Sequence, residues 1–119
     1  MSEAAKPLAA RRERLPDRRE HVVVNFTTGD GFRYTAGLGY FEDGRLAEVF
    51  LNAEKIGTAI ETAARDSAVV ASLALQHGVP PETIRCSLTR NSDGTPSGAL
   101  GTPLELLAKQ EPASREPST

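Results

Sequence analysis

The residues best suited to bind a ligand gather near one polar segment, residues 89–98, with the sequence TRNSDGTPSG. Glycine, serine, asparagine and aspartate favour turns, so we expect an exposed loop here. Arginine offers donors that suit a phosphate or a carboxylate, and the N-terminus of a following helix would add free N–H groups. The alternative is a flexible linker between two helices. The candidate anion-binding or partner-binding residues are Arg85, Arg90, Asn91 and Asp93.

No other part of the sequence matches a known catalytic, cofactor or metal motif. Gly37 and Gly39 lie inside a predicted strand, and Glu42 stands where a dinucleotide-binding fingerprint needs its third glycine. There is no Walker phosphate-binding loop. His21 and His77 are far apart, and neither has a cysteine or histidine at ligand spacing. We therefore expect no catalytic residue, no cofactor ligand and no metal ligand in this chain.

The cysteine content limits the chemistry further. Cys86 is the one cysteine of the 119-residue chain, so an internal disulfide, a dithiol redox pair and a closed thiolate zinc site are excluded. Arg85 beside it could lower the thiol pKa, but a small, half-buried apolar residue is the favoured interpretation. No run of about 18 apolar residues predicts a membrane span. These features favour a reducing, cytoplasmic setting.

Charge and composition divide the chain into three parts. Residues 1–20 carry six basic and four acidic side chains, about +2, and the net charge of −2 leaves about −4 for the remainder. This basic arm has few apolar residues and is expected to be flexible, either as a solvated linker or as an arm that docks on a phosphate or an acidic partner. Residues 109–119 predict a disordered tail. The foldable domain spans residues 21–108.

Three strands are predicted at the start of this domain. Residues 21–28 are rich in β-branched side chains and end at a Gly-Asp-Gly turn. Residues 32–41 alternate between apolar and other positions, and a second Asp-Gly turn precedes residues 46–51. Short turns between consecutive strands indicate an antiparallel meander. The apolar face of the middle strand comprises Phe32, Tyr34, Ala36, Leu38 and Tyr40.

The other face of the middle strand carries Gly37 and Gly39. We favour close packing of a helix against these glycines over a ligand slot, and simple relief of crowding is the third interpretation. Phe41, Val49 and Leu51 are candidates for a second, uncovered face of the sheet. With unprotected edges as well, such a sheet favours a homodimer that pairs edges or faces.

Helices are predicted after the strands. Over residues 58–77 a wide apolar arc indicates a largely buried helix, with Thr58 and Glu61 at capping-box spacing and Gly78 at its end. Shorter helices are expected over 81–88 and 100–109. The prediction is an α+β fold, a three-stranded antiparallel meander followed by a long buried helix and two shorter helices. The polar stripe of the long helix comprises Glu61, Thr62, Arg65, Asp66, Ser72 and Gln76.

Two strings carry a resemblance to a known family. Residues 39–50 read GYFEDGRLAEVF, and residues 72–80 read SLALQHGVP. Together with RLPDRR, ARD and TRNSDG, at residues 14–19, 64–66 and 89–94, they resemble the TSCPD domain. That domain occurs near the C-terminus of adenosylcobalamin-dependent (class II) ribonucleotide reductases and in small free-standing proteins. The Thr-Ser-Cys-Pro-Asp motif itself is absent, so no role of its cysteine carries over.

The resemblance implies a non-catalytic accessory or regulatory module in deoxyribonucleotide synthesis, with a ribonucleotide reductase chain as its partner. Adenosylcobalamin is expected only in full-length relatives. Those enzymes need a radical cysteine and a further cysteine pair, and a barrel of well over 200 residues. One cysteine in a core of about 90 residues supplies neither. The alternative is a small nucleotide-binding or nucleic-acid-binding protein, and reductase activity of its own is the least favoured hypothesis.

Overall fold

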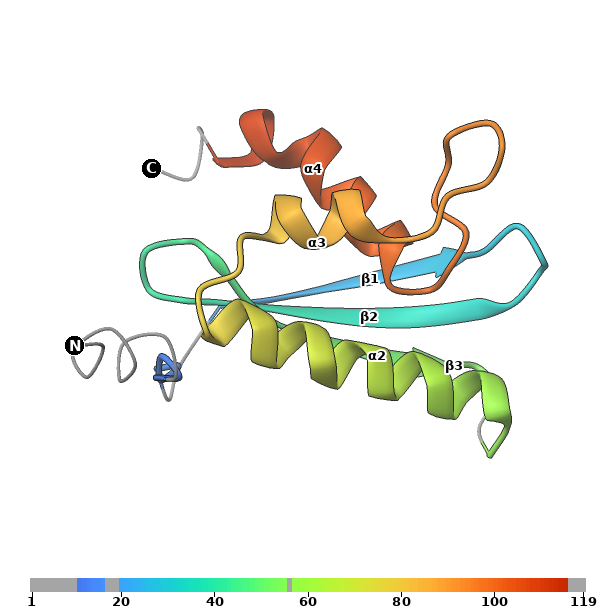
Figure 1. The fold of residues 1–119 in the computed structure, drawn as a ribbon, viewed down its shortest axis with the longest axis horizontal. Coiled ribbons are helices and arrows are strands. Elements are labelled where there is room, and N and C mark those ends of the chain that lie inside the picture. Colours follow the sequence, from blue (N-terminus) through green and yellow to red (C-terminus); the bar gives the residue numbers. More distant parts are fainter. Residues whose placement is uncertain (1–10, 17–19, 56, 116–119) are drawn as a thin grey trace, which may run out of the picture.

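The computed structural model describes residues 11–16, 20–55 and 57–115. Its strands form one antiparallel sheet in the order β1-β2-β3, and the helices follow in the chain (Figure 1). This confirms the α+β fold and the meander. The elements are β1 (His21–Thr27), β2 (Arg33–Tyr40), β3 (Leu46–Ala53), α2 (Ala59–Gln76), α3 (Pro81–Ser87) and α4 (Gly101–Arg115).

The two predicted Asp-Gly turns connect the strands. Gly31 and Gly44 have φ angles of 91° and 93°, a region that is open to glycine and strained for other residues. In the resulting register, Ala36 of β2 lies between Val24 of β1 and Leu51 of β3. Residues that are paired in this way share one face of the sheet.

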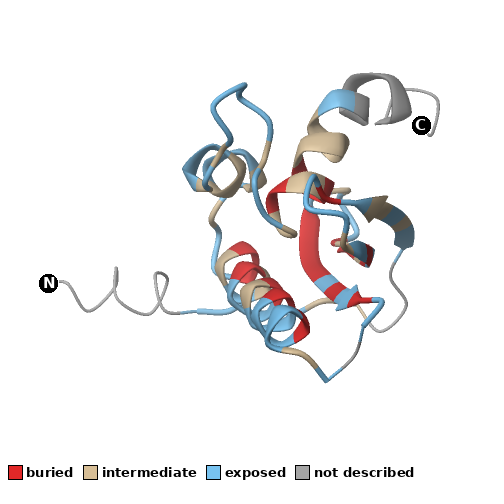
Figure 2. Ribbon diagram, turned by 90° about the vertical axis from the view of Figure 1, so that its right-hand side faces the viewer, coloured by how far each residue is buried: buried red, intermediate tan, exposed pale blue. Residues whose placement is uncertain are grey.

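The hydrophobic core lies between one face of the sheet and the helices. The apolar face of β2 contributes to it as predicted, and α2 packs along β3 while α4 adds Leu104. Figure 2 shows the buried stretches of α2, in red, on the side of the helix that faces the sheet. The core is composed of Tyr34, Ala36, Leu38, Leu46, Val49, Leu51, Ala53, Ala64, Ala68, Leu75 and Leu104.

Gly37 and Gly39 lie on the opposite face, where side chains of β3 cover them. A Cβ on Gly39 would meet the Glu48 side chain, with its Cγ at 2.7 Å, and a Cβ on Gly37 would lie 3.5 Å from the Phe50 ring. The expectation that a helix packs against these glycines is therefore wrong. The glycines instead make room for Phe50 and Glu48.

The candidates for an uncovered face were also placed wrongly, since Phe41, Val49 and Leu51 are all buried. Val49 and Leu51 are paired with Leu38 and Ala36, so they share the helix-covered face. Phe41 follows the end of β2, where strand alternation no longer applies, and the Arg45 guanidinium lies 4.5 Å above its ring.

The ends of α2 follow the predicted signals. The Thr58 hydroxyl accepts a hydrogen bond of 3.1 Å from the Glu61 N–H, and the Glu61 carboxylate accepts one of 2.9 Å from the Gly57 N–H. Gly78 has a φ of 99° just past the C-terminal end. The chain is therefore capped at both ends of this helix by local interactions.

The helix α2 is buried along one side only. Val69, Val70 and Leu73 are 57%, 66% and 39% exposed, and we call these three residues the α2 patch. The prediction of burial around a wide arc is thus wrong in extent, because no described element packs on the outer side of this helix. An exposed cluster of this kind is typical of an interaction surface.

Two residues of the predicted polar stripe bind the outer edge of β3. The Ser72 hydroxyl accepts a hydrogen bond of 2.8 Å from the Val49 N–H and donates one of 3.1 Å to the Val49 carbonyl. The Gln76 side-chain amide donates one of 3.0 Å to the Ala47 carbonyl. These contacts occupy backbone groups that an edge strand would otherwise expose.

The described part of the basic arm contacts the domain. The Glu13 N–H donates a hydrogen bond of 2.7 Å to the Gln76 carbonyl, and the Glu13 carboxylate lies 2.9 Å from Arg45. Residues 1–10 and 17–19, also part of the expected arm, lie outside the described residues. At the other end, α4 extends beyond residue 109 to Arg115, and residues 116–119 lie outside the described residues. Within the described chain, every helix is too short or too polar to traverse a bilayer.

Candidate functional site

The predicted site residues lie on α3 and on the loop that joins it to α4. Arg85 belongs to α3, and Arg90, Asn91 and Asp93 lie on the loop. Arg90 and Pro96 form an isolated β-bridge, and Gly94 has a φ of 89°. The loop is therefore a short hairpin with a defined shape.

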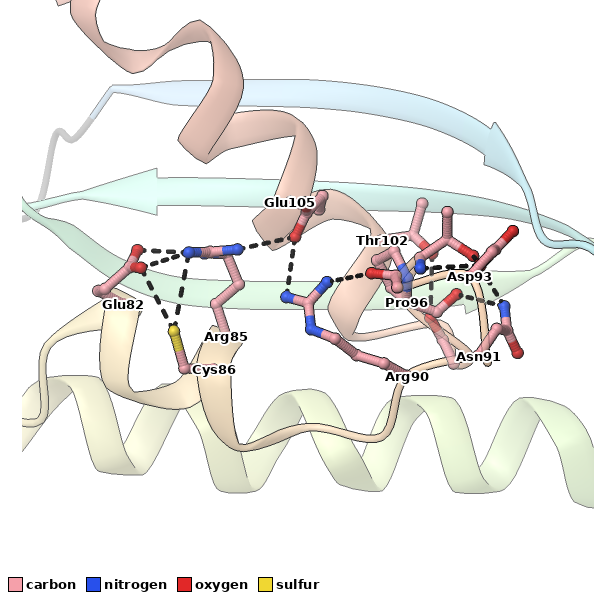
Figure 3. A network of polar contacts seen from close by, with 12 residues as sticks. Glu82, Arg85, Cys86, Arg90, Asn91, Asp93, Pro96, Thr102 and Glu105 are labelled. Carbon is pink, nitrogen blue, oxygen red and sulfur yellow. Dashed lines mark hydrogen bonds and ion pairs between the residues drawn. The ribbon is translucent and has the colours of Figure 1, made fainter.

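Arg85 and Arg90 converge on one carboxylate of α4. The Glu105 Oε1 accepts hydrogen bonds of 2.9 Å from Arg85 Nη1 and 3.0 Å from Arg90 Nη2. Figure 3 shows both guanidinium groups pointing toward this oxygen. The second arm of the Arg90 guanidinium donates a hydrogen bond of 2.8 Å to the Gly94 carbonyl. We call Arg85, Arg90 and Glu105 the Glu105 clasp, because they hold α3, the loop and α4 together.

Arg85 also binds Glu82 one turn earlier on α3. Arg85 Nε donates a hydrogen bond of 3.1 Å to Glu82, and Arg85 Nη2 contacts the second oxygen of the same carboxylate. The Cys86 thiol donates a hydrogen bond of 3.4 Å to Glu82. Cys86 is exposed, so its interpretation as half-buried filler is wrong.

Asn91 and Asp93 bind the loop itself. Asp93 accepts hydrogen bonds from the Thr95 N–H at 3.0 Å and from the Thr95 hydroxyl at 2.6 Å. Asn91 donates to the Thr95 hydroxyl at 3.0 Å and accepts from the Ser97 hydroxyl at 2.8 Å. The structure thus brings Arg85 and Arg90 together at Glu105, whereas Asn91 and Asp93 form hydrogen bonds within the hairpin.

The electrostatics of the clasp favour the charged forms of Glu105 and Arg85. Hydrogen bonds from Arg90 and then Arg85 lower the pKa of Glu105, and the Glu82 and Glu105 carboxylates raise the pKa of Arg85. Glu105 is therefore ionised at neutral pH, and an incoming anion would compete with its carboxylate for both arginines. The roles of Arg85, Arg90, Asn91 and Asp93 in binding an anion, a nucleotide or a partner stay predictions.

Because of the Glu105 clasp, we expect the stability of the fold to decrease at acid pH. The folded pKa of Glu105 lies below its ordinary value of 4.5, so its stabilising contribution is present above that pH. It is lost as the pH falls through the folded value. We expect Glu105→Gln to lower the melting temperature at pH 7 and to reduce the further fall on acidification. Thermal melts between pH 7 and pH 3 would measure both effects.

The matched control is Glu54→Gln, which removes an exposed carboxylate that lies 3.8 Å from Arg33. Exposed pairs of this kind contribute little to stability. Equal melting curves for the two variants would contradict the role of the clasp.

A hollow beside the clasp was not predicted from the sequence. It has a volume of about 220 Å³ between α3, α4 and the β2–β3 turn, and its lining includes Leu46, Leu104 and Leu107. Arg45 and Arg85 stand at its wall, and each is already paired with carboxylates. The described residues contain no group of three metal-ligating side chains.

Comparison with known proteins relates the chain to vitamin B12-dependent ribonucleotide reductases. It is 38% identical over 69 residues to the protein of Bradyrhizobium diazoefficiens, covering 58% of this chain and 5% of that relative. It is 39% identical over 71 residues to the protein of Agrobacterium fabrum, covering 60% of this chain and 6% of that relative. It is 35% identical over 98 residues to the protein of Streptomyces coelicolor, covering 82% of this chain and 10% of that relative.

The chain therefore matches one segment of these reductases and spans only 5% or 6% of the length of the first two relatives. No protein-family model matches the chain. No solved structure matches it either.

Proposed function

We propose that this chain is a non-catalytic accessory module, related to the TSCPD domain, that binds a chain of a vitamin B12-dependent ribonucleotide reductase. The observation that carries the proposal is the 35% identity over 98 residues, 82% of this chain, to a segment that is one tenth of the Streptomyces coelicolor relative. A match that covers so much of the small chain and so little of the large one is typical of a module.

The cysteine content supports a role without catalysis. The single cysteine, Cys86, is exposed on α3 and bound to Glu82. A reductase of the resembled class needs a radical cysteine and a separate cysteine pair, which one thiol cannot provide. The hollow of about 220 Å³ beside α3 is also smaller than ordinary pockets for drug-sized ligands, roughly 300–1,000 Å³, so it does not fit a cobalamin. We propose that adenosylcobalamin binds only in the full-length relatives.

The α2 patch is the surface that we assign to the reductase contact. Its three apolar side chains lie close together on one side of the helix, with Arg65 and Asp66 exposed one turn earlier. An apolar centre beside charged residues is the usual composition of a protein interface. Burying the patch would remove apolar surface that the described fold leaves in water.

Binding to a purified reductase tests this proposal. The probe is a vitamin B12-dependent reductase from which the segment matched by this chain has been deleted, immobilised on a biosensor surface. We expect the wild-type chain to bind and Val70→Lys to weaken binding at least tenfold, or about 1.4 kcal/mol, because the charge would be buried.

The control is Val23→Lys on β1, because Val23 and Val70 are each 66% exposed. This variant is expected to bind the reductase like the wild type. Two results would contradict the proposal: no binding of the wild-type chain, or ribonucleotide reduction by the chain alone with adenosylcobalamin and a dithiol.

A further inference from the structure

The outer edge of β1 presents backbone hydrogen-bonding groups to which no described residue bonds. The Tyr40 N–H donates to the Glu20 carbonyl at 3.2 Å, and the Thr28 N–H donates to the Phe32 carbonyl at 3.0 Å. In an antiparallel ladder such bonded pairs alternate along the strand. The even-numbered residues of β1 therefore bond to β2. The backbone N–H and C=O groups that point away from the sheet belong to His21, Val23, Asn25 and Thr27.

The two edges of the sheet differ in their protection. Ser72 and Gln76 bind the backbone of β3, as described above, whereas no described side chain bonds to the outward groups of β1. The sequence of β1, HVVVNFT, contains no lysine, proline, aspartate or glutamate, and its register with β2 is regular. Edge strands normally carry such charges, prolines or bulges to prevent pairing. Val22 and Val23 are 40% and 66% exposed on this strand.

We propose that β1 pairs antiparallel with β1 of a second copy of this chain, with Val24 of each copy at the two-fold axis. In this register Val23 of one copy lies opposite Asn25 of the other. All four outward residues of each strand then form backbone hydrogen bonds across the axis. The result is a continuous six-stranded sheet.

The sequence of β1 fits itself in this register. Val22 of one copy lies opposite Phe26 of the other, and both belong to the core-facing side of the sheet. No carboxylate, lysine or arginine of one strand meets a like charge of the other. A slip of the register by one residue would place core-facing side chains of one copy opposite side chains on the other face of the second copy. The alternation of side chains along β1 therefore specifies the register. The two-fold symmetry also closes the contact at two copies.

Mass measurements on the purified chain test this proposal without any reductase, so its failure is distinguishable from failure of the proposed function. We expect light scattering and sedimentation equilibrium to give twice the chain mass of 12.7 kDa at high concentration and to show dissociation on dilution. Val23→Lys should give the mass of one chain, because it places lysines of the two copies near the same axis. Val70→Lys, at an equally exposed valine of α2, should remain dimeric.

A second variant guards against misfolding of the first. Val23→Pro removes only an outward N–H, so every β1–β2 hydrogen bond remains. It should also be monomeric, with the wild-type circular dichroism spectrum. Hydrogen exchange followed by NMR should show that the Val23 and Asn25 amides are protected in the wild-type dimer. A single-chain mass at every concentration, unprotected Val23 and Asn25 amides in a dimer, or a dimer lost in Val70→Lys and kept in both Val23 variants would overturn the proposal.

Discussion

Leu38→Ala is expected to lower the free energy of unfolding by about 3 kcal/mol, within the 2–5 kcal/mol usual for such core truncations. Leu38 is 2% exposed in the central strand, between Val22 and Val49. Truncation removes apolar contacts and leaves a cavity that strands on both sides keep open. Because small domains are stable by only about 5–15 kcal/mol, the loss would be a large share of the total.

Urea denaturation followed by circular dichroism would measure this loss. The control is Val70→Ala, which truncates an exposed side chain of α2 and is expected to change stability by less than about 0.5 kcal/mol. A loss below about 1 kcal/mol for Leu38→Ala would show that this position is not at the centre of the core.

Ser72→Ala is expected to cost about 2 kcal/mol, which is large for the loss of one oxygen atom. The Ser72 hydroxyl serves both the N–H and the carbonyl of Val49, and Val49 is 2% exposed. Leaving a buried backbone group without a partner costs about 1–3 kcal/mol. Most of the loss in stability therefore comes from the Val49 backbone groups of β3 that lose their partner, and less comes from the change in the helix itself.

Ser67→Ala provides a matched control within the same helix. The Ser67 hydroxyl donates a hydrogen bond of 2.8 Å to the Ala64 carbonyl, a group that belongs to the helix itself. Because alanine also has the higher helix propensity, this variant is expected to be neutral within about 0.5 kcal/mol. Equal losses in the two variants would mean that the contact with Val49 does not contribute to stability.

The features that were predicted correctly from the sequence are local ones. Gly31 and Gly44 mark turns because few other residues tolerate a positive φ, and Thr58 and Gly78 mark the ends of α2 for equally local reasons. Strand order follows directly from such short turns. None of these inferences requires knowledge of what lies across the core.

The features that were missed depend on contacts between distant residues. Ser72 belongs to a polar stripe in the sequence, and only the packing of α2 on β3 reveals its bond to Val49. Val70 and Leu73 extend the apolar arc of α2, yet the described fold places no element over them. Periodicity identifies which residues share a side of a helix, but it does not identify which side another element covers.

The candidate site shows the same division. The sequence indicates the arginines and the turn-forming loop, whereas Glu105 lies 20 positions from Arg85 and carries no local signal. That carboxylate changes the meaning of Arg85 and Arg90, because it neutralises charge that the sequence alone leaves available for a ligand.

The unequal edges of the sheet also bear on how far association of this chain can proceed. Among the described residues, α2 binds β3 and nothing binds the outer edge of β1, which leaves one sheet edge at which another strand can be added. A chain with a single edge available for pairing forms a dimer and no larger assembly, whereas a sheet that is open at both edges can polymerise without limit. The polar side chains of α2 would thus limit association to two copies, and the contacts that prevent filament growth would lie at the β3 edge, opposite the β1 edge at which the second copy binds.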